Sequence, residues 1–476
     1  MHDTYTSPLG SRYASRAMLE LWSPRTRYGL WRRLWLTLAE AQRELGVDIP
    51  GEAIDQMREH LDEIDFDAVA AYERRFRHDV MAHVHAFGDA APAAKPWIHL
   101  GATSAFVTDN ADLILMRRGL ELLAGRSTVV LRALAAFAHK WRELPTLGYT
   151  HLQPAQLTTV GKRATLWMQD LVLDLRDIEY RRTTMPFRGV KGTTGTQATF
   201  LELFRGDHEK VRRLDQLVTS RMDFSSALAV TGQTYTRKID AGVLSAVSGV
   251  AATAAKFAGD VRMLQSFGEM EVPFEQEQIG SSAMAYKRNP MRSERINSLS
   301  RFVLSLETNA NQTHSVQYFE RTLDDSANRR LAIPEAFLAT DAILILMSNI
   351  ASGLQVYPAR IRQRVDTELP FMATEKLIVQ AVEAGRDRQA VHEIIRRHSM
   401  SSAKAMKEGA TSNDLLARLE QDEEFGLSSG QIAKTTDPSQ FTGRAPEQVD
   451  EFLTEVVHPL LAGTSASIPE DSEIRV

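Results

Sequence analysis

The stretch "DNADLILMRRGLELLAGRSTVVLRALAAFAHKWREL", Asp109 to Leu144, continues for 36 residues without a proline. Helical periodicity dominates the sequence, and sustained strand-like alternation is hard to find. Comparable segments cover Lys238 to Glu269, Met291 to Gln312 and Ala327 to Ser352. Helices well beyond the usual length of roughly 8–20 residues are typical of a bundle. The sequence therefore predicts a mostly α protein with a central bundle of long helices.

Loop-forming residues divide the chain into three mostly helical regions, 1–103, 104–356 and 357–476. Gly, Pro, Ser and Asp gather in "GYTHLQPAQ", "MPFRGVKGTTGTQ", "EVPFEQEQIGSSAM" and "ERTLDDSANRR". The polar end of the chain, residues 463–476, is expected to be disordered. Rigid helices with polar loops at their ends can hold loop residues from distant parts of a chain in one site, so the loops are where chemistry is sought.

Composition excludes several classes of function. The 476 residues have a net charge of −5 and include no cysteine, which excludes disulfides, thiolate catalysis and cysteine-bound zinc. The acidic balance argues against general binding to nucleic acid or anionic membranes. Glu335 and Asp341 interrupt the most apolar stretch, and the N-terminus has no signal pattern, so we expect a cytoplasmic protein with no membrane span.

Two histidine-bearing loops are candidates for chemistry. "RRFRHDVMAHVHAF" contains His78, His83 and His85, but on a helix His83 points away from the other two and no HExxH is present. No metal site is therefore predicted, and partly buried histidines are the simpler interpretation. His151, in "GYTHLQPAQ", lies on a loop, and Pro154 favours an extended residue before it and can open a helix after it. A loop histidine of this kind is suited to proton transfer near neutral pH.

The stretch "GSSAMAYKRNPMRSER", Gly280 to Arg295, combines serines and cations on a turn of small residues. A nucleophilic serine would require a GxSxG motif, which is absent. A phosphate-binding P-loop is also absent here, and the Gly/Thr-rich "KGTTGTQ", Lys191 to Gln197, lacks that motif too. Cations that recur in separate loops could converge on a ligand with several negative charges: Arg12, Arg77, Lys287, Arg295, Arg321, Arg329 and Arg330.

The same stretch resembles the signature of the fumarase/aspartase superfamily, Gly-Ser-Ser-x-Met-Pro-x-Lys-x-Asn-Pro. The matching positions are Gly280, Ser281, Ser282, Met284, Lys287, Asn289 and Pro290. Its longer form is similar to that of the adenylosuccinate lyases of the animal-like type. Further blocks resemble these enzymes in the same order along nearly the whole chain: "SRYAS", "RHDVMAHVH", "HLGATS", "KGTTGTQ", "TGQTYTRK", "FERTLDDSANRR", "ELPFMATE" and "DPSQFTGRA".

This resemblance implies a three-domain fumarase/aspartase-like fold and a homotetramer whose active sites combine loops from different subunits. It also implies release of fumarate from adenylosuccinate, giving AMP, and from SAICAR, giving AICAR. Neither a metal nor an organic cofactor is implied. The alternatives are a lyase that releases fumarate from a different N-substituted aspartate and a lyase-fold protein without turnover.

The resemblance also implies roles for individual residues. Ser281 corresponds to the general base, His151 to the general acid, and Glu294 to the carboxylate that orients this histidine. Lys287 corresponds to the lysine that stabilises the anionic substrate, and His78 to the histidine that contacts and positions it. The nucleotide- and succinyl-binding positions are Arg12, Tyr13, Arg77, Asp79, Thr103, Ser104, Thr150, Gln233, Asn289, Arg295, Arg321, Ser326 and Arg330.

The chain departs from the signature at one position, where Ala285 replaces proline. Proline would fix its own φ and restrict the residue before it. Alanine leaves the unbound loop more conformations, at an ordering cost of about 0.4–1 kcal/mol. The departure therefore concerns closure of the loop rather than the class of reaction.

Overall fold

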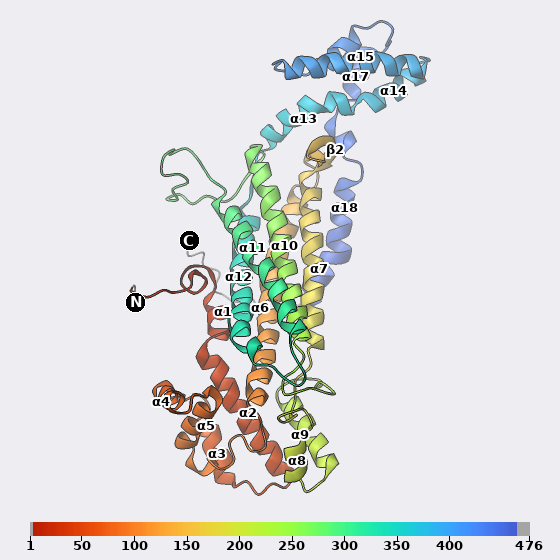
Figure 1. Cartoon of the computed structure of the whole chain (residues 1–476). Helices are drawn as coiled ribbons and strands as arrows, with labels where there is room; N and C mark the ends of the chain where they lie inside the picture. Colours follow the sequence, from red (N-terminus) through yellow and green to blue (C-terminus); the bar gives the residue numbers. More distant parts are fainter. Residues whose placement is uncertain (1–2, 464–476) are drawn as a thin grey trace.

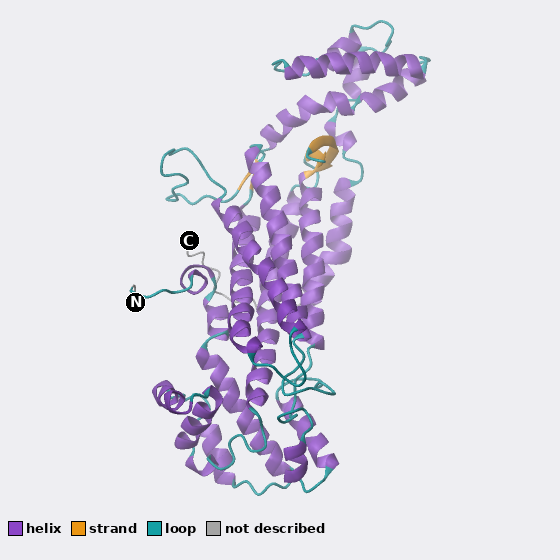
Figure 2. Ribbon diagram, in the orientation of Figure 1, coloured by secondary structure: helices purple, strands orange, loops and turns teal. Residues whose placement is uncertain are grey.

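The chain forms an elongated molecule in which a bundle of long helices separates two smaller groups of helices (Figure 1). The computed structural model describes residues 3–463, so the expectation of disorder for 463–476 concerns residues that lie, except for Gly463, outside the described part. Figure 2 shows that helices dominate and that loops gather at the ends of the bundle, as the sequence predicts for a mostly α protein.

The predicted long helices are confirmed. The bundle consists of α6 (Ser104–Lys140), α7 (Val160–Thr184), α10 (Lys238–Ser266), α11 (Met291–Ser315) and α12 (Asp324–Gly353). Helix α6 packs against α7 and α12, and α10 packs against α11 and α7. Helices α10 and α12 are long and apolar enough to cross a membrane, but most of each apolar segment is buried inside the bundle. Both are therefore core helices of this fold.

Helix α7 shows how the sequence builds the bundle. Ala164, Trp167 and Leu171 recur every three or four residues and are almost completely buried. Burying a large apolar side chain stabilises the fold by about 1.5–3 kcal/mol before the cost of chain entropy. The helix begins where the Thr159 hydroxyl accepts a hydrogen bond from the Lys162 N–H at 3.1 Å, which satisfies one of its free amides.

The N-terminal helices cover one end of the bundle together with a short helical pair from the middle of the chain (Figure 1). The elements at this end are η1 (Leu9–Tyr13), α1 (Arg16–Leu21), α2 (Pro24–Glu44), α3 (Gly51–Glu59), α4 (Phe66–Phe76), α5 (Asp79–Ala90), η2 (Pro92–Ala94), α8 (Ala198–Leu203) and α9 (His208–Arg221). Helix α2 contacts both α6 and α9, so the N-terminal region is anchored to the bundle.

The C-terminal helices lie at the opposite end (Figure 1) and have a small core of their own between Ala373 and Ile432. They are α13 (Pro358–Met372), α14 (Thr374–Glu383), α15 (Arg388–Lys407), α16 (Leu415–Glu420), α17 (Ser429–Lys434) and η3 (Pro438–Phe441). The chain then returns to the bundle, where α18 (Ala445–Phe452) packs against α7. The short η4 (Leu453–Val457) and α19 (His458–Gly463) follow.

Two small antiparallel strand pairs complete the described structure. Strand β1 (Pro145–Thr150) pairs with β2 (Gln153–Thr159), and β3 (Met270–Glu271) pairs with β4 (Gln355–Val356). The expectation that Pro154 opens a helix is wrong, because residues 153–159 continue as a strand and α7 begins only at Val160. The extended geometry expected for Gln153 is confirmed.

Candidate active site

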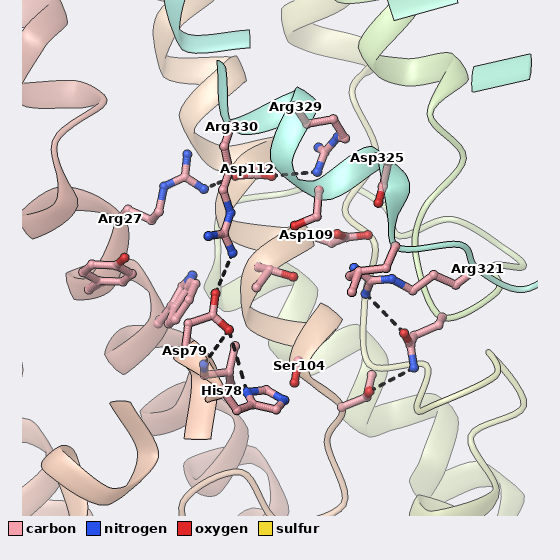
Figure 3. A pocket seen from close by; sticks show the side chains of 18 of the residues that line it. Arg27, His78, Asp79, Ser104, Asp109, Asp112, Arg321, Asp325, Arg329 and Arg330 are labelled. Carbon is pink, nitrogen blue, oxygen red and sulfur yellow. Dashed lines mark hydrogen bonds and ion pairs between the residues drawn. The ribbon is translucent and has the colours of Figure 1, made fainter. Parts of the chain in front are cut away.

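A cavity of about 1370 Å³ opens where the N-terminal helices meet the bundle (Figure 3). Its walls come from α2, the start of α5, the start of α6, the loops before α8 and α10, and the start of α12. Half of the predicted site residues line it: Arg77, His78, Asp79, Thr103, Ser104, Gln233, Arg321, Ser326 and Arg330.

The start of α5 places His78 and Asp79 in this cavity. The His78 Nδ1 accepts a hydrogen bond from the Met81 N–H at 3.4 Å, so this histidine caps the helix. The Asp79 carboxylate accepts the Val80 N–H at 2.8 Å and pairs with the Arg330 guanidinium at 2.5 Å (Figure 3). One predicted binding cation, Arg330, is thus paired with a carboxylate of the same chain.

Gln233 connects two other walls of the cavity. Its side-chain amide donates to the Thr103 hydroxyl at 3.4 Å and accepts from the Arg321 guanidinium at 3.2 Å. Its backbone N–H donates to the Glu320 carbonyl at 3.0 Å. Within residues 3–463, no carboxylate pairs with Arg77 or Arg321. The cavity therefore presents two guanidinium groups that an anionic ligand could engage.

A buried ion network forms one wall of the cavity. Arg237 pairs with Asp109 at 3.2 Å and with Asp325 at 2.7 Å. Arg329 pairs with Asp112 at 3.0 Å (Figure 3). These residues belong to α6, α12 and the residue before α10, so the network ties together three of the segments that position the cavity residues.

The charges in this network hold one another in the ionised state. Burial alone would lower the pKa of Arg329, but Asp240, Tyr235 and Asp112 together raise it well above its usual value. Burial likewise raises the pKa of Asp112, and the neighbouring Arg27 and Arg329 outweigh that effect and lower it. The network therefore gives this wall of the cavity charges that do not change near neutral pH.

A second group of predicted residues lies beside the start of α11. The Arg295 guanidinium lies over the Tyr13 ring at 5.5 Å from its centre. Burial lowers the pKa of Arg295, Tyr13 opposes the shift, and the nearby positive charge of Arg12 adds to it. The Glu294 carboxylate lies 3.9 Å from the Arg262 guanidinium of α10. Arg12 and Arg292 thus both lie close enough to Arg295 to act on its charge.

The loop before α11 has a defined turn and projects from the bundle (Figure 1). The Ser281 hydroxyl accepts the Met284 N–H at 3.1 Å, and the Lys287 N–H donates to the Met284 carbonyl at 3.0 Å. The Asn289 side chain donates to the Gly280 carbonyl at 2.8 Å and closes the loop. The Lys287 side chain is exposed and Ser281 is half-buried, so the loop in this structure does not enclose the two residues together.

Thr150 and His151 lie at the tip of the β1–β2 hairpin. His151 and Leu152 form a two-residue turn, and both have positive φ values, 53° and 57°. Such values match the turn that two-residue hairpins prefer. His151 is exposed, and within the described residues no hydrogen bond or ion pair connects it to Glu294. A single chain therefore does not assemble the predicted acid with its carboxylate.

The other two histidines of the predicted cluster have structural surroundings. The buried His83 ring lies tilted against Tyr28 and edge-on to Trp31, with ring centres 3.9 and 5.2 Å away, and burial lowers the pKa of this histidine to about 4. His85 stacks with Tyr72 and Phe76. No group of possible metal ligands occurs in the described part of the chain.

Sequence reasoning missed several residues that line the cavity: Arg27, Tyr28, Glu73, Asp109, Asp112, Thr193, Thr194, Arg237 and Asp325. A signal existed for two of them, because Asp109 and Asp112 are carboxylates inside an otherwise apolar helix. Buried carboxylates need partners, so polar residues at such positions indicate an ion network. The identity of their partners was not readable from the sequence.

Comparisons with known proteins define the class of the protein. A lyase family matches residues 30–304, and the adenylosuccinate lyase C-terminus family matches residues 370–452. The fold is shared with a fumarate lyase from Mesorhizobium sp. BNC1, with a TM-score of 0.80 and 22% identity over 97% of this chain and 100% of that one. A 3-carboxy-cis,cis-muconate lactonizing enzyme from Pseudomonas putida gives 0.81 and 22% over 94% and 98%. The chain has the fold of the fumarase/aspartase superfamily and is a lyase.

Sequence relatives narrow the class further. The chain is 53% identical to adenylosuccinate lyase from Saccharomyces cerevisiae over 97% of this chain and 96% of that protein. It is 49% identical to the enzyme of Schizosaccharomyces pombe over 99% and 98%, and 46% identical to that of Schistosoma mansoni over 100% and 99%. The chain therefore belongs to the adenylosuccinate lyase family.

Proposed function

We propose that this protein cleaves adenylosuccinate to AMP and fumarate, and SAICAR to AICAR and fumarate. The observation that supports this most directly is the cavity at the N-terminal end of the bundle. It combines Arg77, Arg321 and Arg330 with neutral donors such as Ser104 and Gln233. Planar guanidinium groups and fixed donors are suited to a substrate that has both a phosphate and carboxylates.

The proposed reaction is a β-elimination by general acid and base. Ser281 takes the proton from the carbon β to the departing nitrogen, and His151 protonates that nitrogen as the carbon–nitrogen bond breaks. Glu294 orients and charges the histidine. Proton removal beside a carboxylate places negative charge on its oxygens, so fixed donors and cations at that position lower the barrier.

Serine is a weak base in water and depends on its surroundings. In the proposed closed loop, Lys287 and backbone N–H groups lower the pKa of the Ser281 hydroxyl while water is excluded. Gly280 allows this approach, because a Cβ at that position would overlap the Lys287 carbonyl oxygen. His78 holds the substrate in the cavity. Neither a metal nor an organic cofactor is needed for these steps.

We further propose a homotetramer in which each active site combines residues from several subunits. Its support is the separation of the predicted residues within one chain, since the end cavity contains His78 but neither His151 nor Ser281. Helix α7 also leaves Leu166, Leu173 and Tyr180 exposed by 51%, 50% and 59%. Their spacing of seven residues places them along one face, as in helices that pack against a partner helix.

The proposal also covers the domain boundaries of the chain and its cellular location. Helix α6 begins at Ser104 and α13 at Pro358, which supports an N-terminal domain at 1–103, a central domain at 104–356 and a C-terminal domain at 357–476. The absence of cysteine is consistent with a cytoplasmic protein, and the net charge of −5 with one that acts on small molecules rather than on nucleic acid or anionic membranes.

The test mixes purified protein with adenylosuccinate and follows the ultraviolet absorbance change of fumarate release. We expect turnover by the natural chain, loss of most turnover in Ser281→Ala and His151→Ala, and near-normal turnover in Ser282→Ala. Ser282 is the matched control because it is the neighbouring serine on the same loop. Absence of turnover by the natural chain would contradict the function, and normal turnover by Ser281→Ala would contradict the mechanism.

A further inference from the structure

The Gly/Thr-rich loop from Gly192 to Thr196 forms part of the cavity wall but has no role in the proposed function. Thr193 and Thr194 line the cavity and are exposed to it. Gly192 and Gly195 have φ values of 79° and 83°, a left-handed conformation that glycine adopts without strain. The two glycines thus flank the pair of threonines that line the cavity.

The backbone N–H groups of this loop are free. Within residues 3–463, the five N–H groups of residues 192–196 donate to no backbone carbonyl and to no side chain, although the N–H of Gln197 donates to the Lys191 carbonyl. Successive free N–H groups in a glycine-rich turn form concavities that bind anionic oxygens. Two threonine hydroxyls at the cavity add donors of the same kind.

A buried arginine holds the loop in place. The Arg188 side chain is 0% exposed, and its guanidinium donates to the carbonyls of Gln233 at 2.6 and 2.9 Å, Gly189 at 3.1 Å and Gly192 at 3.1 Å. The same side chain therefore clamps the loop and the backbone of Gln233. Gly195 fixes the other side, because a Cβ there would overlap the Thr231 carbonyl.

The surroundings of the loop favour an anion bound through hydrogen bonds from neutral donors. Lys191, the cation at its start, is already paired with Asp215 at 2.6 Å. In the described part of the chain, the hydrogen-bond partners of the Arg188 guanidinium are all backbone carbonyl oxygens, so its positive charge lies behind the loop without a directly paired carboxylate. Across from the loop, Arg321 donates to the side chain of Gln233.

We propose that residues 192–196 form a carboxylate-binding subsite that takes one carboxylate of the succinyl part of the substrate, and that Arg188 is the positioning residue of this subsite. The inference deepens the proposed function and rests on it for the identity of the ligand. In a β-elimination the negative charge develops on a carboxylate next to the proton that leaves. Donors fixed beforehand around that carboxylate stabilise the transition state more than the ground state.

The test measures how fumarate and AMP each raise the melting temperature of the full-length protein, from which the two dissociation constants follow. Thr193→Val and Thr194→Val remove hydroxyls at the cavity, and Thr199→Val is the control, an exposed threonine just beyond the loop and outside the cavity lining. Gly195→Ala displaces the backbone donors. Its control is Gly206→Ala, which has the same type of φ, 85°, but open space around it.

We expect each cavity threonine variant to weaken fumarate binding by about 10- to 100-fold, the value of one hydrogen bond to a charged group. Gly195→Ala should weaken fumarate binding at least as much. AMP binding by these variants, and fumarate binding by both controls, should stay within about twofold of the natural chain. Arg188→Lys, which retains the charge with fewer donors, should weaken fumarate binding more than AMP binding.

The subsite is contradicted if the threonine variants and Gly195→Ala all bind fumarate as their controls do, or if they lose AMP rather than fumarate, which would make it a phosphate subsite. This measurement needs no turnover. A natural chain that binds fumarate through this loop but does not cleave adenylosuccinate would refute the proposed function while leaving the subsite intact. A natural chain that cleaves adenylosuccinate, with variants that bind fumarate normally, would refute the subsite alone.

Discussion

His78 and His151 lie at opposite ends of helix α6. His78 lines the cavity beside Ser104, the first residue of this helix, and His151 follows its last residue, Lys140, by eleven positions, at the tip of a hairpin. A helix of 37 residues is about 55 Å long. The two histidines of one chain therefore cannot act on the same small molecule. Either only one of them acts, or the active site combines residues from different chains.

The buried ion network connects α6, α10 and α12 at the end of the bundle where His78 lies. Arg237 is 1% exposed and pairs with both Asp109 and Asp325. Replacement by methionine would leave two buried carboxylates without this partner, and breaking a buried pair costs about 3–5 kcal/mol. We therefore expect Arg237→Met to lower the urea midpoint strongly at a fixed protein concentration.

The control for this variant is Arg212→Met, since Arg212 pairs with Glu209 on the surface, where both side chains are exposed. Exposed pairs contribute about 0–1 kcal/mol, so its midpoint should hardly move. Similar midpoints for the two variants would show that the network does not stabilise the cavity.

Ala285 occupies the second position of the turn from Met284 to Lys287, which a 3.0 Å hydrogen bond closes. Proline is favoured at this position, and in the described structure the Ala285 N–H donates no hydrogen bond that proline would remove. We propose that the closed loop keeps this turn, so Ala285→Pro should lower the ordering cost of closure by about 0.4–1 kcal/mol. We expect steady-state kinetics to show a KM for adenylosuccinate about two- to fivefold lower.

Ala285→Gly is the opposite change at the same position, because glycine gives the free loop more conformations to lose. It should raise the KM. If both substitutions shifted the KM in the same direction, ordering of this loop would not control substrate binding.

Asp174 of α7 predicts a dependence of stability on pH. Burial raises its pKa to about 6; Thr253 opposes this shift, and Asp170 and Asp177 add to it. Because the pKa in the folded state is above that in the unfolded state, ionising this carboxylate lowers the stability of the fold. The full cost applies above about pH 6, and none of it remains below about pH 4. Asp174→Asn should remove about 1–3 kcal/mol of this cost at pH 7.5.

The measurement is the melting temperature of Asp174→Asn and of the natural chain at pH 7.5, 6 and 5. The advantage of the variant should shrink as the pH falls through this range. A constant advantage of Asp174→Asn at all three pH values would contradict the assigned shift.

The long helices were predictable because long apolar segments, free of proline except for Pro334 in α12, have few other ways to bury their side chains. The β1–β2 hairpin was not, because Pro154 near the start of β2 argued against a strand and neither strand shows sustained alternation in the sequence. Motifs indicated the site residues one by one. They could not show that His78 and His151 are separated by a whole helix, or that Asp109 meets Arg237, since both facts depend on how distant segments pack.

The most direct test of the shared active site mixes two inactive variants. His78→Gln and His151→Gln are purified separately, mixed in equal amounts under conditions that exchange subunits, and assayed with adenylosuccinate. If each site takes these histidines from different subunits, roughly a quarter of the sites in the mixture will have both, and activity will rise toward that fraction of the natural value. If the mixture stays as inactive as its two components after subunit exchange, the shared site is contradicted.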